Sequence, residues 1–119
     1  MAEEGSQMAG AIQSTFSPDQ LAAALTSRKL RVQVRESSHY EGGRYIAVYE
    51  GATEFTLEKI PGEYLARGDA SSVEQMHDAV SCVSAALTTL DIRHVFEIYD
   101  ENSQLVRYEH HRWPPINSM

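Results

Sequence analysis

Two runs of alternating apolar and polar residues, Arg44 to Glu50 and Thr53 to Ile60, are separated only by Gly51 and Ala52. Alternation with a period of two is typical of a strand with one buried face. Glycine in the first position of a two-residue loop suits a tight type II′ hairpin. This feature constrains the fold most, because it fixes a register in which every cross-strand pair can be named. The expected pairs are Glu50 with Thr53, Val48 with Phe55, Ile46 with Leu57, Tyr49 with Glu54 and Tyr45 with Glu58.

A third alternating run precedes this hairpin, with Leu30, Val32 and Val34 on one face and arginines on the other. If Val34 meets Ile46 and Val32 meets Val48, the polar face carries two cross-strand rows. These rows are Arg31-Tyr49-Glu54 and Arg35-Tyr45-Glu58. Tyr and Arg are enriched at binding hot spots, so these six residues are the candidate partner-binding site. The same rows also form on an ordinary solvated sheet face, which is the alternative interpretation.

Two helices are indicated by their start signals. The first begins at Ser17-Pro18, where Ser17 can cap, Pro18 suits the first helical position and Gln20 can reach back to the cap. The second follows Ser71 and Ser72 and carries an apolar stripe at spacings of three and four residues. The stripe comprises Val73, Met76, Val80, Val83, Leu87 and Leu90.

A second hairpin, Arg93 to Asp100 and Gln104 to His111, is predicted around a three-residue loop. In that register Ile98 faces Val106 and His94 faces His110. Asn102 or Ser103 would take the left-handed position that glycine usually fills.

The sequence therefore predicts an α+β fold: a mainly antiparallel five-stranded sheet with one long helix on one face and a short N-terminal helix, in the order α-β-β-β-α-β-β. Residues 1–15 are expected to form a flexible tail, residues 16–113 a single domain, and residues 114–119 a C-terminal tail. This order is similar to that of the small acidic secretion chaperones of bacteria, which carry an additional C-terminal helix.

Few residues suggest catalysis. His94 and His110 are the weak candidates for a metal site, because two ligands fall short of the three or four that zinc requires. Cys82 follows His77 by five residues, more than one helical turn, so no local nucleophile and base are formed. No glycine-rich phosphate loop is present, and we expect no cofactor.

Charge and cysteine content narrow the function classes. Seventeen acidic against ten basic residues give a net charge of −7, which has the wrong sign for a nucleic-acid-binding protein. No apolar run approaches the roughly 20 residues of a membrane span. The single cysteine and the acidic start predict a cytoplasmic protein.

The leading prediction is a non-catalytic protein-binding module, of the chaperone or toxin-neutralising kind, with a basic or mixed-charge protein partner. One alternative is a small metal-dependent or ligand-binding enzyme that uses His94 and His110. Another is a homo-oligomeric structural protein whose sheet edge or second helix face forms its own dimer contact.

Overall fold

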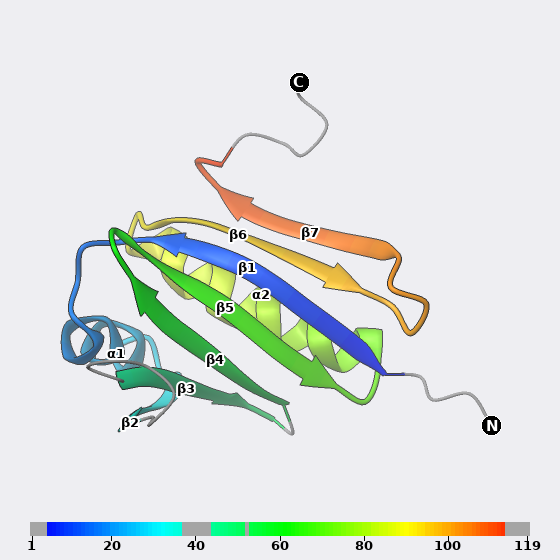
Figure 1. Ribbon diagram of the computed structural model, residues 1–119, viewed down its shortest axis with the longest axis horizontal. Helices are drawn as coiled ribbons and strands as arrows, with labels where there is room; N and C mark the ends of the chain where they lie inside the picture. Colours follow the sequence, from blue (N-terminus) through cyan, green and yellow to red (C-terminus); the bar gives the residue numbers. More distant parts are fainter. Residues whose placement is uncertain (1–4, 37–43, 52, 114–119) are drawn as a thin grey trace.

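The computed structural model describes residues 5–36, 44–51 and 53–113. They form an α+β fold whose antiparallel sheet has seven strands in the order β2-β3-β4-β5-β1-β6-β7 (Figure 1). The elements are β1 (Ser6–Gln13), α1 (Pro18–Thr26), β2 (Arg31–Glu36), β3 (Arg44–Glu50), β4 (Thr53–Ile60), β5 (Glu63–Ala70), α2 (Val73–Thr89), β6 (Arg93–Tyr99) and β7 (Leu105–His111).

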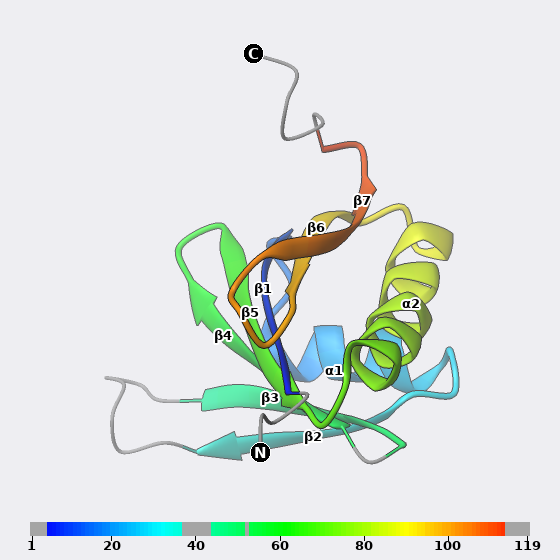
Figure 2. The same cartoon turned by 90° about the vertical axis from the view of Figure 1, so that its right-hand side faces the viewer.

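The sheet is curved, and both helices lie on its concave side (Figure 2). We call this side the inner face and the opposite side the outer face. The core lies between the inner face and α2, whose buried residues are Met76, Ala79, Val80, Val83, Ser84, Ala86 and Leu87. In the described part of the chain, neither helix has the length and apolar character needed to cross a membrane.

The expected flexible tail over residues 1–15 is wrong for Ser6–Gln13, which form β1 in the middle of the sheet. This strand pairs with β5 on one side and β6 on the other. Met8 and Ile12 are buried in the core, but Ala9, Gly10 and Ala11 between them are small. Glycine is required at position 10 because Phe96 of β6 lies over it: a Cβ added there would lie 2.6 Å from Phe96 Cδ1.

The second additional strand is β5, which the expected five-stranded sheet does not contain. Pro61 and Gly62 turn the chain, and Gly62 adopts a φ of +79°, as the third residue of a type II turn does. The strand then runs the full length of β4, with Ile60 opposite Glu63 and Glu54 opposite Asp69. The sheet thus has seven strands instead of five, and the chain begins with a strand instead of a helix.

The registers predicted for the first three strands of the expected fold are confirmed. All five pairs of the β3–β4 hairpin occur as expected, and Gly51 takes a φ of +60° in its turn. The β2–β3 pairing also matches, with Val34 opposite Ile46 and Val32 opposite Val48. Both helix caps are observed: Ser17 and Gln20 form a capping box, and the Ser72 side chain accepts a hydrogen bond from the Gln75 backbone.

The register predicted for the last hairpin is correct only at its turn. Ser103 takes the left-handed conformation with a φ of +61°, and Tyr99 faces Leu105. A β-bulge at Val106 then shifts the pairing by one residue, so that Ile98 faces Arg107. The predicted C-terminal tail, residues 114–119, lies outside the described residues.

Candidate functional site

The six predicted partner-binding residues lie on the outer face of β2, β3 and β4. Backbone pairing places Arg31, Tyr49 and Glu54 in one row. A parallel row contains Arg35, Tyr45 and Glu58. The arginines and Glu54 are exposed, whereas both tyrosines and Glu58 are half-buried. We call these six residues the Arg–Tyr face.

Within this face, Arg35 contacts Tyr49 instead of the tyrosine in its own row. Its guanidinium group donates a hydrogen bond to the Tyr49 hydroxyl and lies 5.4 Å from the centre of the Tyr49 ring. Arg35 also donates to Gln33 Oε1, at 3.3 Å from Nε and 3.2 Å from Nη2. The contact passes over the row that contains Ala47, which is fully buried although it lies on the outer face.

The consequence is an ordered cationic and aromatic surface. A guanidinium held against an aromatic ring and an amide oxygen loses less conformational freedom on binding than a free arginine does. Sequence reasoning placed these residues on one face but did not identify the diagonal contact. The signal that could have found it is the small Ala47 between Tyr45 and Tyr49, which leaves room for a long side chain to cross.

A hollow of about 610 Å³ adjoins this surface at the outer edge of the sheet. Its lining residues are Thr26, Leu30, Arg31, Val32, Gln33, Arg35 and Tyr49. Because β2 is the last strand on this side, the hollow follows a sheet edge whose backbone groups can accept an added strand.

The positive charge of the chain is concentrated near this edge. Five of the ten Lys and Arg residues lie within positions 28–44, although the chain carries a net charge of −7. Arg31 and Arg35 belong to the Arg–Tyr face, and Glu54 and Glu58 lie two strands away on the same side of the sheet. The surface therefore presents a strip of positive charge and a strip of negative charge, with the tyrosines of β3 between them.

The histidines expected to face each other do not. His94 lies opposite His111, because of the bulge in β7, and His110 lies opposite Val95 and is exposed. His94 is buried on the inner face, whereas His110, opposite Val95, lies on the outer face. No group of three His, Cys, Asp or Glu side chains in the described ranges is arranged to hold a metal ion.

His94 instead links β6 to α2. Its Nδ1 donates to the Ile92 carbonyl at 2.8 Å, so Nε2 accepts a hydrogen bond from the Ser84 hydroxyl at 2.7 Å. Burial lowers the pKa of His94 below its ordinary value, and the nearby His111 and His110 lower it further. A serine next to a histidine base can act as a nucleophile. Here both residues are buried, and the group that orients the histidine is the Ile92 backbone carbonyl instead of a carboxylate. The pair is a structural link between helix and sheet.

Other polar contacts fasten β7 and its flanking residues to the helix side of the fold. His77 on α2 lies 3.6 Å from Glu109 Oε2 on β7, and His111 Nε2 lies 2.9 Å from Asp91 Oδ1. The hydrogen bond from His111 holds the pKa of Asp91 below its ordinary value. Sequence reasoning did not identify these pairs, because they depend on the shifted register of β7.

Cys82 is exposed and forms no disulfide. Partial desolvation of its thiol raises its pKa, and the carboxylates of Glu50 and Asp78 add to the shift. A thiol with a raised pKa is a poor nucleophile at neutral pH, so its surroundings argue against a catalytic role.

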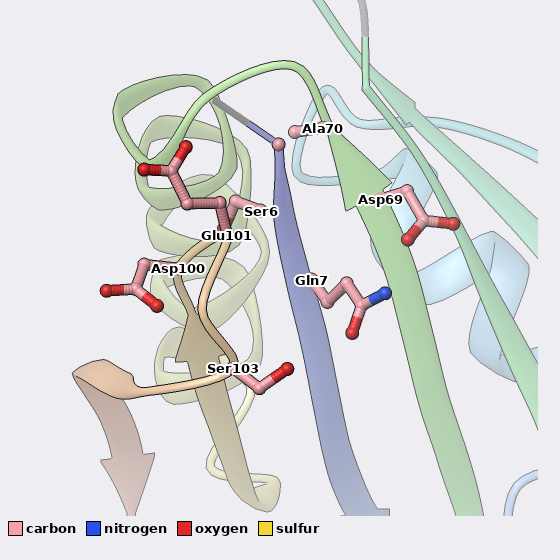
Figure 3. Close-up of a pocket in the computed structure, with 8 residues that line it drawn as sticks. Ser6, Gln7, Asp69, Ala70, Asp100, Glu101 and Ser103 are labelled. Carbon is pink, nitrogen blue, oxygen red and sulfur yellow. The ribbon is translucent and has the colours of Figure 1, made fainter. Parts of the chain in front are cut away.

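A polar cleft of about 330 Å³ lies at one end of β1. Figure 3 shows its carboxylates on opposite sides of that strand: Asp69 on β5, and Asp100 and Glu101 in the β6–β7 turn. Asp100 Oδ1 accepts hydrogen bonds from the backbone of Asn102 and Gln104, so it stabilises the turn. These carboxylates do not converge on a common point.

No protein-family model matches the chain, and no curated protein sequence matches it.

Proposed function

We propose that the protein is a non-catalytic protein-binding module, of the chaperone or toxin-neutralising kind, and that its Arg–Tyr face contacts a mixed-charge partner. The observation that supports this most is the ordered contact of Arg35 with Tyr49 and Gln33 on the outer face. Tyrosine and arginine supply a large share of the binding energy at protein interfaces.

The charges of the face indicate the chemistry of the partner. Arg31 and Arg35 would meet acidic groups, and Glu54 and Glu58 would meet basic groups about two strand spacings away. A segment of the partner that carries both signs in this spacing would match the face, and one of a single sign would not. The hollow along β2 would accept an extended stretch of the same partner. A reducing, cytoplasmic setting belongs to this proposal, since the chain has a single cysteine.

The test begins with the protein as bait in an extract of its native cell, which supplies the partner. Affinity is then measured by calorimetry for wild type and for Tyr45→Ala and Tyr49→Ala variants. Each substitution should cost about 1 to 4 kcal/mol of binding free energy, with much smaller effects on thermal unfolding. Neutralising Glu54 and Glu58 to glutamine should mainly slow association and reduce its salt dependence, as stopped-flow mixing would show.

Tyr99→Ala is the matched control, because Tyr99 is a half-buried tyrosine on the outer face of β6, remote from β2 and β3. It should bind like wild type. If the Tyr45→Ala, Tyr49→Ala double variant kept wild-type affinity, the Arg–Tyr face would be an ordinary solvent surface.

A further inference from the structure

The strand at the end of the sheet opposite to β2 is β7, which pairs with β6 along one edge (Figure 1). Among the described residues, no strand pairs with its other edge. Leu105 and Val106, at its start, are 41% and 42% exposed, two of the three large apolar residues with such exposure in this part of the chain. An edge strand with exposed apolar residues is a template for adding another strand.

We propose that this edge binds the β7 edge of a second copy of the chain, antiparallel, around a two-fold axis at Tyr108. In this arrangement Arg107 faces Glu109 of the second copy, and Glu109 faces Arg107 of the second copy. The two seven-stranded sheets then join into one continuous sheet. The contact is isologous and closes on itself, as the interface of a two-fold dimer must.

The backbone limits the choice of register. Along an edge strand, the N–H and C=O groups of alternate residues point outward, and only residues that point outward can exchange hydrogen bonds. Two copies of one strand can therefore pair only in registers where the paired residue numbers have an even sum. Near the centre of β7 this leaves three registers, with axes at Arg107, at Tyr108 or at Glu109.

Charge selects one of these registers. An axis at Arg107 would place that arginine opposite itself, and an axis at Glu109 would place two glutamates in contact. Like charges directly opposite each other destabilise a strand pair, whereas opposite charges stabilise it. Only the axis at Tyr108 gives two opposite-charge pairs. The two charged pairs also lie in the regular part of β7, beyond the bulge at Val106.

The arginine is available for this contact. Arg107 is exposed, and none of the ion pairs found in the described ranges includes it. Glu109 lies on the same side of β7 and is 3.6 Å from His77, so its carboxylate is positioned from within its own chain. Paired directly across the new strand boundary, the two side chains would have Cβ atoms about 5 Å apart.

The edge of β2 does not have this complementarity. β2 has six residues, so its two central registers have axes at Gln33 and at Val34. The first would place Arg31 opposite Arg35 twice, and the second would place Arg35 opposite Gln33 and Glu36 opposite Val32. Cationic residues on an edge are a common means of preventing such pairing. The two edges therefore differ: the β7 edge offers two opposite-charge pairs, and neither central register of β2 offers any.

The test is sedimentation velocity of the full chain over a wide range of concentration. Wild type should show a concentration-dependent dimer. Arg107→Glu should weaken dimerisation at least tenfold, because two glutamates would then face each other in both pairs. Glu109→Arg should have a similar effect, since it creates two arginine pairs. The double variant, Arg107→Glu with Glu109→Arg, restores opposite charges and should recover most of the dimer.

Controls separate this proposal from the proposed function and from loss of folding. Arg31→Glu on the β2 edge and Tyr45→Ala on the Arg–Tyr face should leave the dimer unchanged, and thermal melting should show that every variant is folded. As an independent measurement, a spin label at Tyr108→Cys in a Cys82→Ser background should report a short distance between copies.

Four results would each overturn the proposal. They are a monomer at every concentration, a dimer that Arg107→Glu leaves intact, failure of the double variant to recover association, and growth into oligomers larger than dimers.

Discussion

Two glycines on the inner face of the sheet lie beneath aromatic rings of neighbouring strands. Phe96 of β6 covers Gly10 of β1, and Phe55 of β4 covers Gly68 of β5. A ring can approach the backbone closely at these positions because glycine has no Cβ in the way. The close approach also brings the neighbouring backbone within reach of Gly10, where an added Cβ would lie 2.4 Å from the Val95 carbonyl oxygen.

Gly10→Ala should therefore destabilise the protein, although alanine is normally the better residue in a strand. The added methyl group meets backbone, which can move only if β1 and β6 separate, so we expect a loss of about 1 to 3 kcal/mol of unfolding free energy or more. Gly68→Ala is the matched comparison, because its two nearest neighbours are atoms of the Phe55 ring and the nearest backbone atom, the Glu54 carbonyl oxygen, lies 3.4 Å from the added Cβ. Urea unfolding of both variants would test this difference, and equal losses would show that the backbone contact at Gly10 is unimportant.

The buried His94 makes stability sensitive to acid. Its pKa in the folded state is lowered below the unfolded value of about 6.5, so the unfolded chain binds the proton more readily. The full stability is then present above about pH 6.5 and declines as pH falls toward the folded pKa. Three residues of β7 also act on the pKa of His94: His111 and His110 lower it, and Glu109 raises it.

A His94→Gln variant should lose less stability on acidification than wild type, because glutamine can still bond Ser84 but does not titrate. Unfolding free energies measured by urea titration above and below pH 6.5 would show this as a flatter slope. Equal slopes for variant and wild type would show that His94 does not control the acid response.

At the scale of residues, the sequence predicts which residues share a cross-strand row but not which side chains contact each other. The positions of Arg35 and Tyr49 follow from register, which period and turn length determine. Their mutual contact depends on side-chain conformations that cross a row, and no backbone pattern encodes those. The link between Ser84 and His94 has the same character, since it joins a helix and a strand whose relative position the sequence pattern leaves open.

At the scale of elements, tight turns decide what can be predicted. The β3–β4 hairpin is fully predictable because its turn has two residues and both strands alternate. The β6–β7 hairpin is predicted only beside its turn, because a bulge adds one residue without a distinctive signal at Val106. The strand β1 is missed altogether, because its central residues are small and therefore carry no hydrophobic period.

Deletion of residues 5–13 should consequently abolish cooperative folding. The deletion removes β1 from between β5 and β6 and leaves two long strand edges without partners in the centre of the sheet. Circular dichroism and thermal melting of the truncated chain would show the loss. A truncated protein with a melting transition like that of wild type would mean that β5 and β6 can pair directly.

At the scale of the whole molecule, one curved sheet separates two kinds of surface. The inner face is covered by α1 and α2, so the outer face and the two sheet edges remain for contacts with other molecules (Figure 2). The β2 edge and the adjoining Arg–Tyr face carry much of the positive charge, and the β7 edge lies at the far end of the same sheet. A partner and a second copy would therefore bind at opposite ends without competing.

The position of β1 between β5 and β6 also means that, during synthesis, β1 must wait for its pairing partners. The ribosome makes this strand before the other six strands, but β6, one of its two neighbours, begins 87 residues after β1 does, at Arg93 compared with Ser6. At about 5 to 20 residues per second, the wait lasts roughly 4 to 17 seconds. Throughout that time β1 exposes backbone groups that other nascent chains could pair with. Its Ala-Gly-Ala centre has little of the bulky, β-branched character that drives such pairing, so the strand that waits longest is poorly suited to aggregation.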